Sequence, residues 1–91
     1  MKTEAAKRKR LQGMILGVLH TEYPGAMDSV VLKFALKNLG WVVVSESLKR
    51  EVMILAEKHL IEFAEPAEGI CWVRILPAGI DAIESGEMEV E

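Results

Sequence analysis

The chain has 91 residues, of which 51% are apolar, and a formal net charge of −3. A chain of this length forms one domain, and none of its apolar runs approaches the roughly 18 residues of a membrane-spanning helix. A single cysteine excludes an internal disulfide, and no signal peptide is recognisable, so we expect a cytoplasmic protein. The apolar fraction exceeds the usual range for soluble domains. We therefore expect part of it to lie in a subunit interface.

The charges are distributed unevenly along the chain. Residues 1–10 contain five basic side chains and one acid, residues 11–60 contain five of each sign, and residues 61–91 contain eight acids and one arginine. A basic N-terminal segment can meet nucleic-acid phosphates, whereas an acidic C-terminal segment is repelled by them. The predicted organisation is a loose N-terminal arm over 1–6, one domain over 7–86 and an acidic tail over 87–91.

The spacing of apolar residues predicts helices over about 5–22 and about 29–39. The buried stripe of the first helix consists of Leu11, Met14, Ile15, Val18 and Leu19. Pro24 ends that helix, since the residue before a proline avoids helical conformations. Asp28 is a good N-cap for the second helix, and Gly40 fits a left-handed residue after its end.

Trp41-Val42-Val43-Val44 allows two interpretations. Four β-prone residues in a row can form a strand, but their place between two helices favours the extended turn of a helix-turn-helix. The third helix is predicted over about 46–59, and either Ser45 or Ser47 could cap it. The apolar stripe of this helix consists of Leu48, Val52, Leu55 and His59.

The last elements are a hairpin and a short helix. Residues 61–64 and 70–76 predict two strands, joined by a turn over 65–69. Pro77 suits the first turn of a helix over about 78–85. A helix that leads directly into a β-hairpin is typical of the end of a winged helix-turn-helix. We therefore expect a mainly α domain with a small antiparallel β-hairpin.

Two segments of the chain resemble bacterial winged-helix regulators. The run from Val43 to Ile61 resembles their turn and recognition helix, with His59 in the place of the usual glycine. The run Ile75-Leu76-Pro77-Ala78-Gly79 resembles their exit from the wing, with Pro77 in the place of a threonine. Most of the chain is also similar to small winged-helix proteins of Mu-like bacteriophages that are labelled as relatives of the arsenic-responsive repressors. This resemblance implies a winged helix-turn-helix fold and a phage-encoded regulator, and it bears on the fold more than on any activity.

The third predicted helix carries side chains that could read DNA. The candidate base contacts are Ser47, Lys49, Arg50 and Met53. The candidate phosphate contacts are Lys7, Arg8, Lys9, Arg10, Lys33 and Lys37. Arginine pairs with the O6 and N7 atoms of guanine, while lysine and serine reach bases or phosphates. The alternative is that these are ordinary solvated charges on amphipathic helices.

Three features weigh against DNA binding. The third helix has equal numbers of acids and bases, Glu65 and Glu68 lie at the hairpin tip, and the whole chain is acidic, whereas DNA-binding domains are typically basic. The favoured function is a homodimeric regulator that binds double-stranded DNA at symmetric half-sites. The alternative is an interaction module that binds another protein and not DNA. Trp72 is then the candidate partner contact, because it points away from the core face that Val73 and Ile75 define.

We expect neither a metal site nor catalysis. His20, His59 and Cys71 lack the closely spaced pairs that zinc sites use, and the paired cysteines of metal-sensing repressors are absent. Cys71 lies in an apolar strand, which fits a small core residue better than a nucleophile. The sequence therefore predicts no cofactor and no enzymatic activity.

Overall fold

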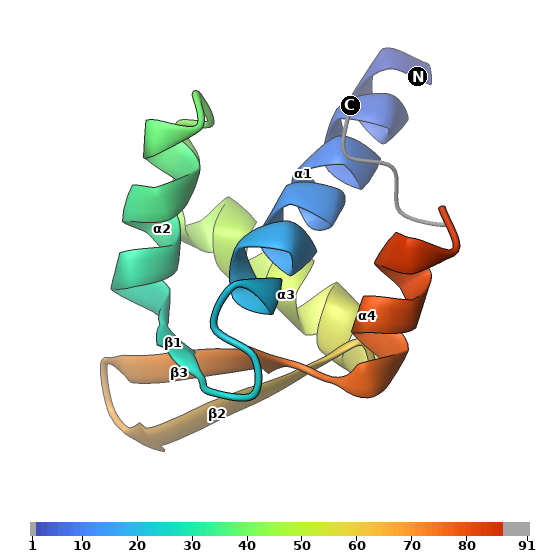
Figure 1. Ribbon diagram of the computed structural model, residues 1–91. Helices are drawn as coiled ribbons and strands as arrows, with labels where there is room; N and C mark the ends of the chain where they lie inside the picture. Colours follow the sequence, from blue (N-terminus) through green and yellow to red (C-terminus); the bar gives the residue numbers. More distant parts are fainter. Residues whose placement is uncertain (1, 87–91) are drawn as a thin grey trace.

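The computed structural model describes residues 2–86, with side chains described from residue 5 onward. In this part of the chain, four helices and three strands form a winged helix-turn-helix, the fold class that the sequence predicts. In chain order the elements are α1 (Lys2–His20), β1 (Met27–Asp28), α2 (Ser29–Asn38), α3 (Ser45–Glu57), β2 (Ile61–Ala67), β3 (Ile70–Ile75) and α4 (Pro77–Glu84). Helix α1 lies in the middle with α2 and α4 on its two flanks, α3 crosses behind it, and the sheet lies at one end (Figure 1).

The first helix differs from its prediction at both ends. In place of the loose arm predicted over 1–6, α1 extends back to Lys2, through a segment rich in the strong helix formers alanine, lysine and glutamate. The helix ends at His20, two residues before its predicted end. The acidic tail predicted over 87–91 lies outside the described residues.

The core lies where α1, α2, α3 and the sheet meet. The largest fully buried apolar side chains are Ile15, Leu16, Leu19, Leu32, Leu36, Leu55, Ile61, Val73 and Ile75. The sheet has the strand order β1-β3-β2, and β3 is antiparallel to both neighbours. The sequence prediction lacks β1, because two residues are too few to show the alternation of a strand. In β1, Met27 pairs with Val73 and Asp28 with Trp72.

The helix-turn-helix forms as predicted. Residues 41–44 are a turn and not a strand, and Val43 is the valine that fills the core. Asp28 caps α2, with its carboxylate accepting a hydrogen bond from the Val30 N–H at 2.7 Å. Gly40 follows α2 with a φ of 92°, a conformation that glycine adopts without steric cost.

The start of α3 contradicts the predicted serine cap. Val44 is the N-cap residue, and no side chain makes a capping hydrogen bond. Ser45 is already helical, and its hydroxyl accepts a hydrogen bond from Lys33 Nζ at 3.0 Å. Ser45 therefore ties the first turn of α3 to α2.

The end of α3 turns the chain sharply into β2. His59 adopts a left-handed conformation with a φ of 62°. The His59 N–H donates to the Ala56 carbonyl, and the Leu60 N–H donates to the Leu55 carbonyl. This bond pattern is the common glycine-based helix ending, so His59 has the backbone role of the glycine that it replaces.

The hairpin and α4 complete the fold. Strand β2 continues to Ala67, beyond the predicted 61–64, with an irregularity in the pairing between Ala64 and Ala67. Helix α4 begins at Pro77 and contains Gly79, which is buried against the backbone of Leu60. This close approach fixes α4 beside the junction between α3 and β2.

Candidate nucleic-acid interface

The first half of α3 presents three of the four predicted base contacts to solvent. Lys49, Arg50 and Met53 are exposed, and 63% of the Arg50 side chain is accessible. Ser47 is half-buried. The opposite face of the helix carries Leu48, Val52 and Leu55 of the predicted stripe, which are buried in the core. The fourth predicted member, His59, is exposed and lies beyond the end of α3 at Glu57. The packing of this stripe determines which side of α3 remains free.

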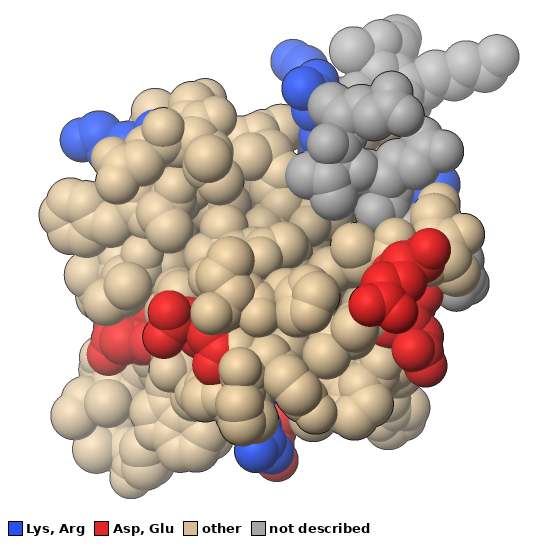
Figure 2. Space-filling model, in the orientation of Figure 1, with Lys and Arg blue, Asp and Glu red and all other residues tan. Residues whose placement is uncertain are grey.

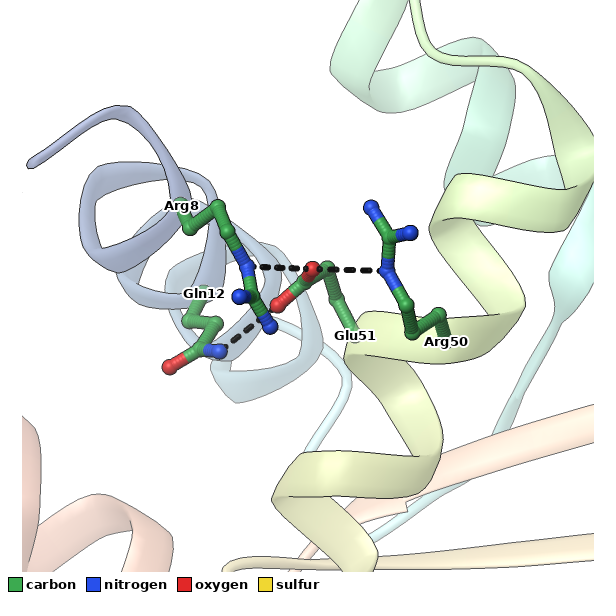
Figure 3. Close-up of polar contacts among 4 residues, drawn as sticks. All are labelled: Arg8, Gln12, Arg50 and Glu51. Carbon is green, nitrogen blue, oxygen red and sulfur yellow. Dashed lines mark hydrogen bonds and ion pairs between the residues drawn. The ribbon is translucent and has the colours of Figure 1, made fainter. Parts of the chain in front are cut away.

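A buried carboxylate links α3 to α1. The Glu51 side chain is only 1% exposed. Its Oε2 atom accepts a hydrogen bond from Arg8 Nε at 3.0 Å, and its Oε1 atom accepts one from Gln12 Nε2 at 2.7 Å. Arg50 Nε lies 3.5 Å from the same Oε2 atom (Figure 3). Two arginines and a glutamine thus satisfy one buried charge.

The sequence prediction does not single out Glu51, which enters it only as one of the three acids that balance the charge of the third helix. A signal was present, because residue 51 is three positions after Leu48 and four before Leu55, and such positions share one helix face. Arg8 and Gln12 are likewise four residues apart on α1, so they can reach the same partner. A carboxylate on an apolar stripe, opposite two donors spaced in this way, indicates a buried polar contact.

The burial of Glu51 changes the charge of the exposed α3 surface. Its negative charge is withdrawn from solvent and compensated by Arg8 from α1 and by Arg50. The exposed first half of α3 is left with Lys49 and Arg50 against Glu46. The charge balance that the sequence indicates for the helix is therefore shifted towards positive on its free side.

The predicted phosphate contacts fall into three groups. Arg8 is engaged with Glu51, although its guanidinium remains partly exposed. Lys33 bonds to Ser45 and so lies against the first turn of α3, and Lys37 is exposed one turn further along α2. The remaining three, Lys7, Lys9 and Arg10, are exposed on the N-terminal half of α1. The contacts of Lys33 and Arg8 bring these two directly to α3.

The charged side chains of the hairpin are mainly acidic, and its arginine, Arg74, is paired with an acid. Glu65 and Glu68 are exposed at its tip, and Glu62 forms an ion pair with Arg74 across the two strands.

Partial burial raises the pKa of the Cys71 thiol, and the neighbouring Glu65 raises it further. The thiol is therefore protonated near neutral pH, which is unfavourable for a nucleophile.

Trp72, the predicted partner contact, is neither buried nor fully exposed. It is half-buried, in the middle strand of the sheet, with Asp28 and Ala64 as its partners in register. The sequence indicates a two-stranded hairpin with a free outer face, and the added strand β1 changes that environment. Val73 and Ile75 occupy the core face as predicted, whereas Cys71, the third residue predicted on that face, is only half-buried.

The described residues hold no cluster of three or more histidine, cysteine, aspartate or glutamate side chains that could bind a metal ion. None of the helices in the described part combines the length and the apolar character needed to cross a bilayer.

Solved structures with the same fold were found, although no protein-family model and no curated protein matches the chain. A structure of RosR from H. salinarum has a TM-score of 0.70 and 23% identity, over 84% of this chain and 67% of that one. A complex structure of RosR-S1 has a TM-score of 0.69 at 23% identity, over 85% and 67% of the two chains. A PadR-like transcription factor from Bacteroides fragilis has a TM-score of 0.68 at 15% identity, over 96% and 86%. At such identities the likeness concerns the fold, and it agrees with a winged helix-turn-helix.

Proposed function

We propose that the chain is a transcription regulator that binds double-stranded DNA with α3 in the major groove. The observation that carries this proposal is the free side of α3, where Lys49 and Arg50 are exposed and Glu51 is withdrawn into the core. The first half of a recognition helix is the part that contacts base edges. The PadR-like transcription factor with the same fold adds support.

Each candidate side chain has a role in this proposal. Arg50 and Lys49 contact guanine edges, because arginine and lysine pair with the O6 and N7 atoms of that base. Met53 makes apolar contacts in the groove, and Ser47 contacts a base or a phosphate. Phosphates are bound by Lys33 and Lys37 from α2 and by the basic first half of α1, which fixes the orientation of α3.

We further propose that two copies bind symmetric half-sites about 34 Å apart, as two-fold dimers of such domains do. The surface of α1 and α4 suits the interface, since Met14, Val18, Ile80 and Ile83 are only partly buried there. Uncharged side chains cover most of the centre of this face, with acids at the α4 edge and a second acidic group on the opposite side (Figure 2). The protein is then a phage-encoded cytoplasmic regulator that acts by binding and not by catalysis.

The test is the salt dependence of binding to a generic DNA duplex, measured by fluorescence anisotropy. We expect binding at about 50 mM salt that weakens steeply as the salt concentration rises. Lys49→Ala should weaken binding several-fold and lower the salt slope by about 1. The matched control is Lys58→Ala, which removes the same charge just beyond the other end of α3 and should leave the affinity nearly unchanged. Absence of binding at low salt, or equal effects of the two substitutions, would contradict the proposal.

A further inference from the structure

Most of the exposed large apolar side chains lie on α2 or on the turn that follows it. Nine large apolar residues are exposed in the described part of the chain, and six of them lie on α2 or on the turn that follows it: Val30, Val31, Phe34, Leu39, Val42 and Val44. Phe34 is 63% exposed and Val42 is 86% exposed. Isolated apolar residues on a surface are ordinary, but a contiguous group of them marks a contact surface.

Helix α2 is apolar on two faces. Leu32 and Leu36 are fully buried in the core, while Val30, Val31 and Phe34 face away from it. A helix on the surface of a domain normally pairs one apolar stripe with a polar opposite face. The second apolar face of α2 therefore has no partner within the described residues.

The outer face of α2 borders a groove. A hollow of about 320 Å³ lies between α2 and the turn, and we call it the α2 groove; Val30, Phe34, Trp41 and Val42 line it, together with Lys33 and Lys37. A second hollow of about 170 Å³ adjoins it and shares Val30, Lys33 and Ser45. Together they form an apolar depression that runs from α2 towards α3 and the sheet.

The charges around the depression have one sign. The charged side chains that line the two hollows are Lys33, Lys37 and Lys49, and no acid among the described residues lines either of them. A second copy of the same surface would bring lysines against lysines across a two-fold axis, which is unfavourable. DNA phosphates would satisfy the lysines but would leave Phe34 and Val42 without an apolar contact.

We propose that the α2 groove binds an acidic peptide segment of another protein that carries large apolar side chains. The apolar side chains fill the hollow between Phe34, Trp41 and Val42, and the carboxylates pair with Lys33 and Lys37. Apolar anchors with complementary charges around them are a common way for a groove to recognise a peptide. The depression shares Lys33, Lys37 and Lys49 with the proposed DNA contacts, so it adds a protein partner that competes with DNA for these lysines.

Trp41 gives a direct readout of occupancy, because it lines the groove. The protein carries Trp72→Phe, so that Trp41 is the remaining tryptophan. The probes are two synthetic peptides of about 15 residues, one with leucines three to four residues apart among glutamates and one with every glutamate replaced by lysine. We expect a saturable change in Trp41 fluorescence with the acidic peptide and binding at least about tenfold weaker with the basic one.

Two neighbouring valines provide a matched pair of variants. Val30 lines both hollows and is 58% exposed, while Val31 lines neither and is 53% exposed. Val30→Ser should weaken binding of the acidic peptide several-fold, and Val31→Ser should leave it unchanged. Because both residues are exposed, neither substitution removes core packing, and far-ultraviolet circular dichroism checks that both variants fold.

The proposal is overturned if the acidic peptide does not bind at millimolar concentration, if both peptides bind equally well, or if the two valine variants behave alike. A shift from dimer to monomer in size-exclusion chromatography of Phe34→Asp would assign the groove to a second copy, and this also overturns it. Loss of duplex binding in Val30→Ser, without loss of peptide binding in that variant, would assign the surface to DNA. Duplex binding that persists while peptide binding fails refutes the peptide proposal alone.

Discussion

Glu51 is the single residue on which the proposed DNA interface depends most. A buried carboxylate is costly unless it is paired and fully hydrogen-bonded, and here Arg8, Gln12 and Arg50 surround it. The same contacts hold the first half of α1 against α3 and keep the Arg50 side chain close to the helix. One side chain thus links the packing of α3 to the charge that its free side presents.

Glu51→Gln should lower the free energy of unfolding by about 1–3 kcal/mol. The amide keeps the shape of the side chain but places a donor and no negative charge opposite Arg8. Urea unfolding followed by circular dichroism measures the change. Glu46→Gln is the control, since this exposed acid on the same helix should change the free energy by no more than about 0.5 kcal/mol. Equal effects at the two positions would mean that Glu51 is not held as described.

His59→Gly should raise the free energy of unfolding by about 1 kcal/mol. A left-handed conformation is strained for a residue with a Cβ atom, and His59 has a φ of 62°. The control is Lys58→Gly, because Lys58 has a φ of −84° and gains nothing from glycine. Stabilisation by Lys58→Gly but not by His59→Gly, in thermal or urea unfolding, would refute the left-handed turn at the end of α3.

At the scale of elements, apolar spacing identifies every helix, because each buries one stripe of residues against the same core. The ends are less predictable. The sequence shows the caps at Asp28 and Gly40 since their chemistry is local, but Ser45 is used in a contact with Lys33 that only the packed structure creates. Strand β1 is likewise not predictable from local sequence, because its pairing with β3 depends on a strand far along the chain.

The sequence predicts which side chains of the candidate site are exposed, but not what lies beside them. Helical periodicity places Lys49, Arg50 and Met53 opposite the buried stripe, and the structure exposes all three. Periodicity alone does not show which partner compensates Glu51 or what lies beside Trp72, since both depend on neighbouring elements. The buried face of α2 differs from its prediction. Helical spacing puts Val31, Phe34, Ala35 and Asn38 on one face with Val30 and Leu36 beside it, whereas the structure buries Leu32 and Leu36 and exposes Val31 and Phe34.

Gly79→Ala should lower the free energy of unfolding by about 1–3 kcal/mol. A Cβ atom at this position would collide with the Leu60 carbonyl oxygen and lie 2.8 Å from Ile75 Cγ1, so α4 would have to move. Gly17→Ala is the control, because a Cβ atom there meets no other atom within 4 Å and alanine is the better helix former. Thermal unfolding that ranks Gly17→Ala below Gly79→Ala would refute the close packing of α4.

At the scale of the whole molecule, distinct surfaces surround one small core. The exposed first half of α3 carries Lys49 and Arg50 against Glu46, the α2 groove is apolar with lysines, and the hairpin tip is acidic. Acidic side chains also lie at the α4 edge of the face in Figure 2, and α3 lies behind α1 in the same orientation (Figure 1). The net negative charge of the chain therefore does not describe the surface that we assign to DNA.

The most direct test of that assignment is a nuclear magnetic resonance titration of the isotope-labelled protein with a short duplex at about 50 mM salt. We expect the largest shifts at the backbone amides of Lys49, Arg50 and Met53, with smaller shifts around Lys33. The amides of the hairpin tip and of α4 should be unaffected. Shifts that are largest at Glu65, Glu68 or α4, or no shifts at all, would contradict DNA binding through α3.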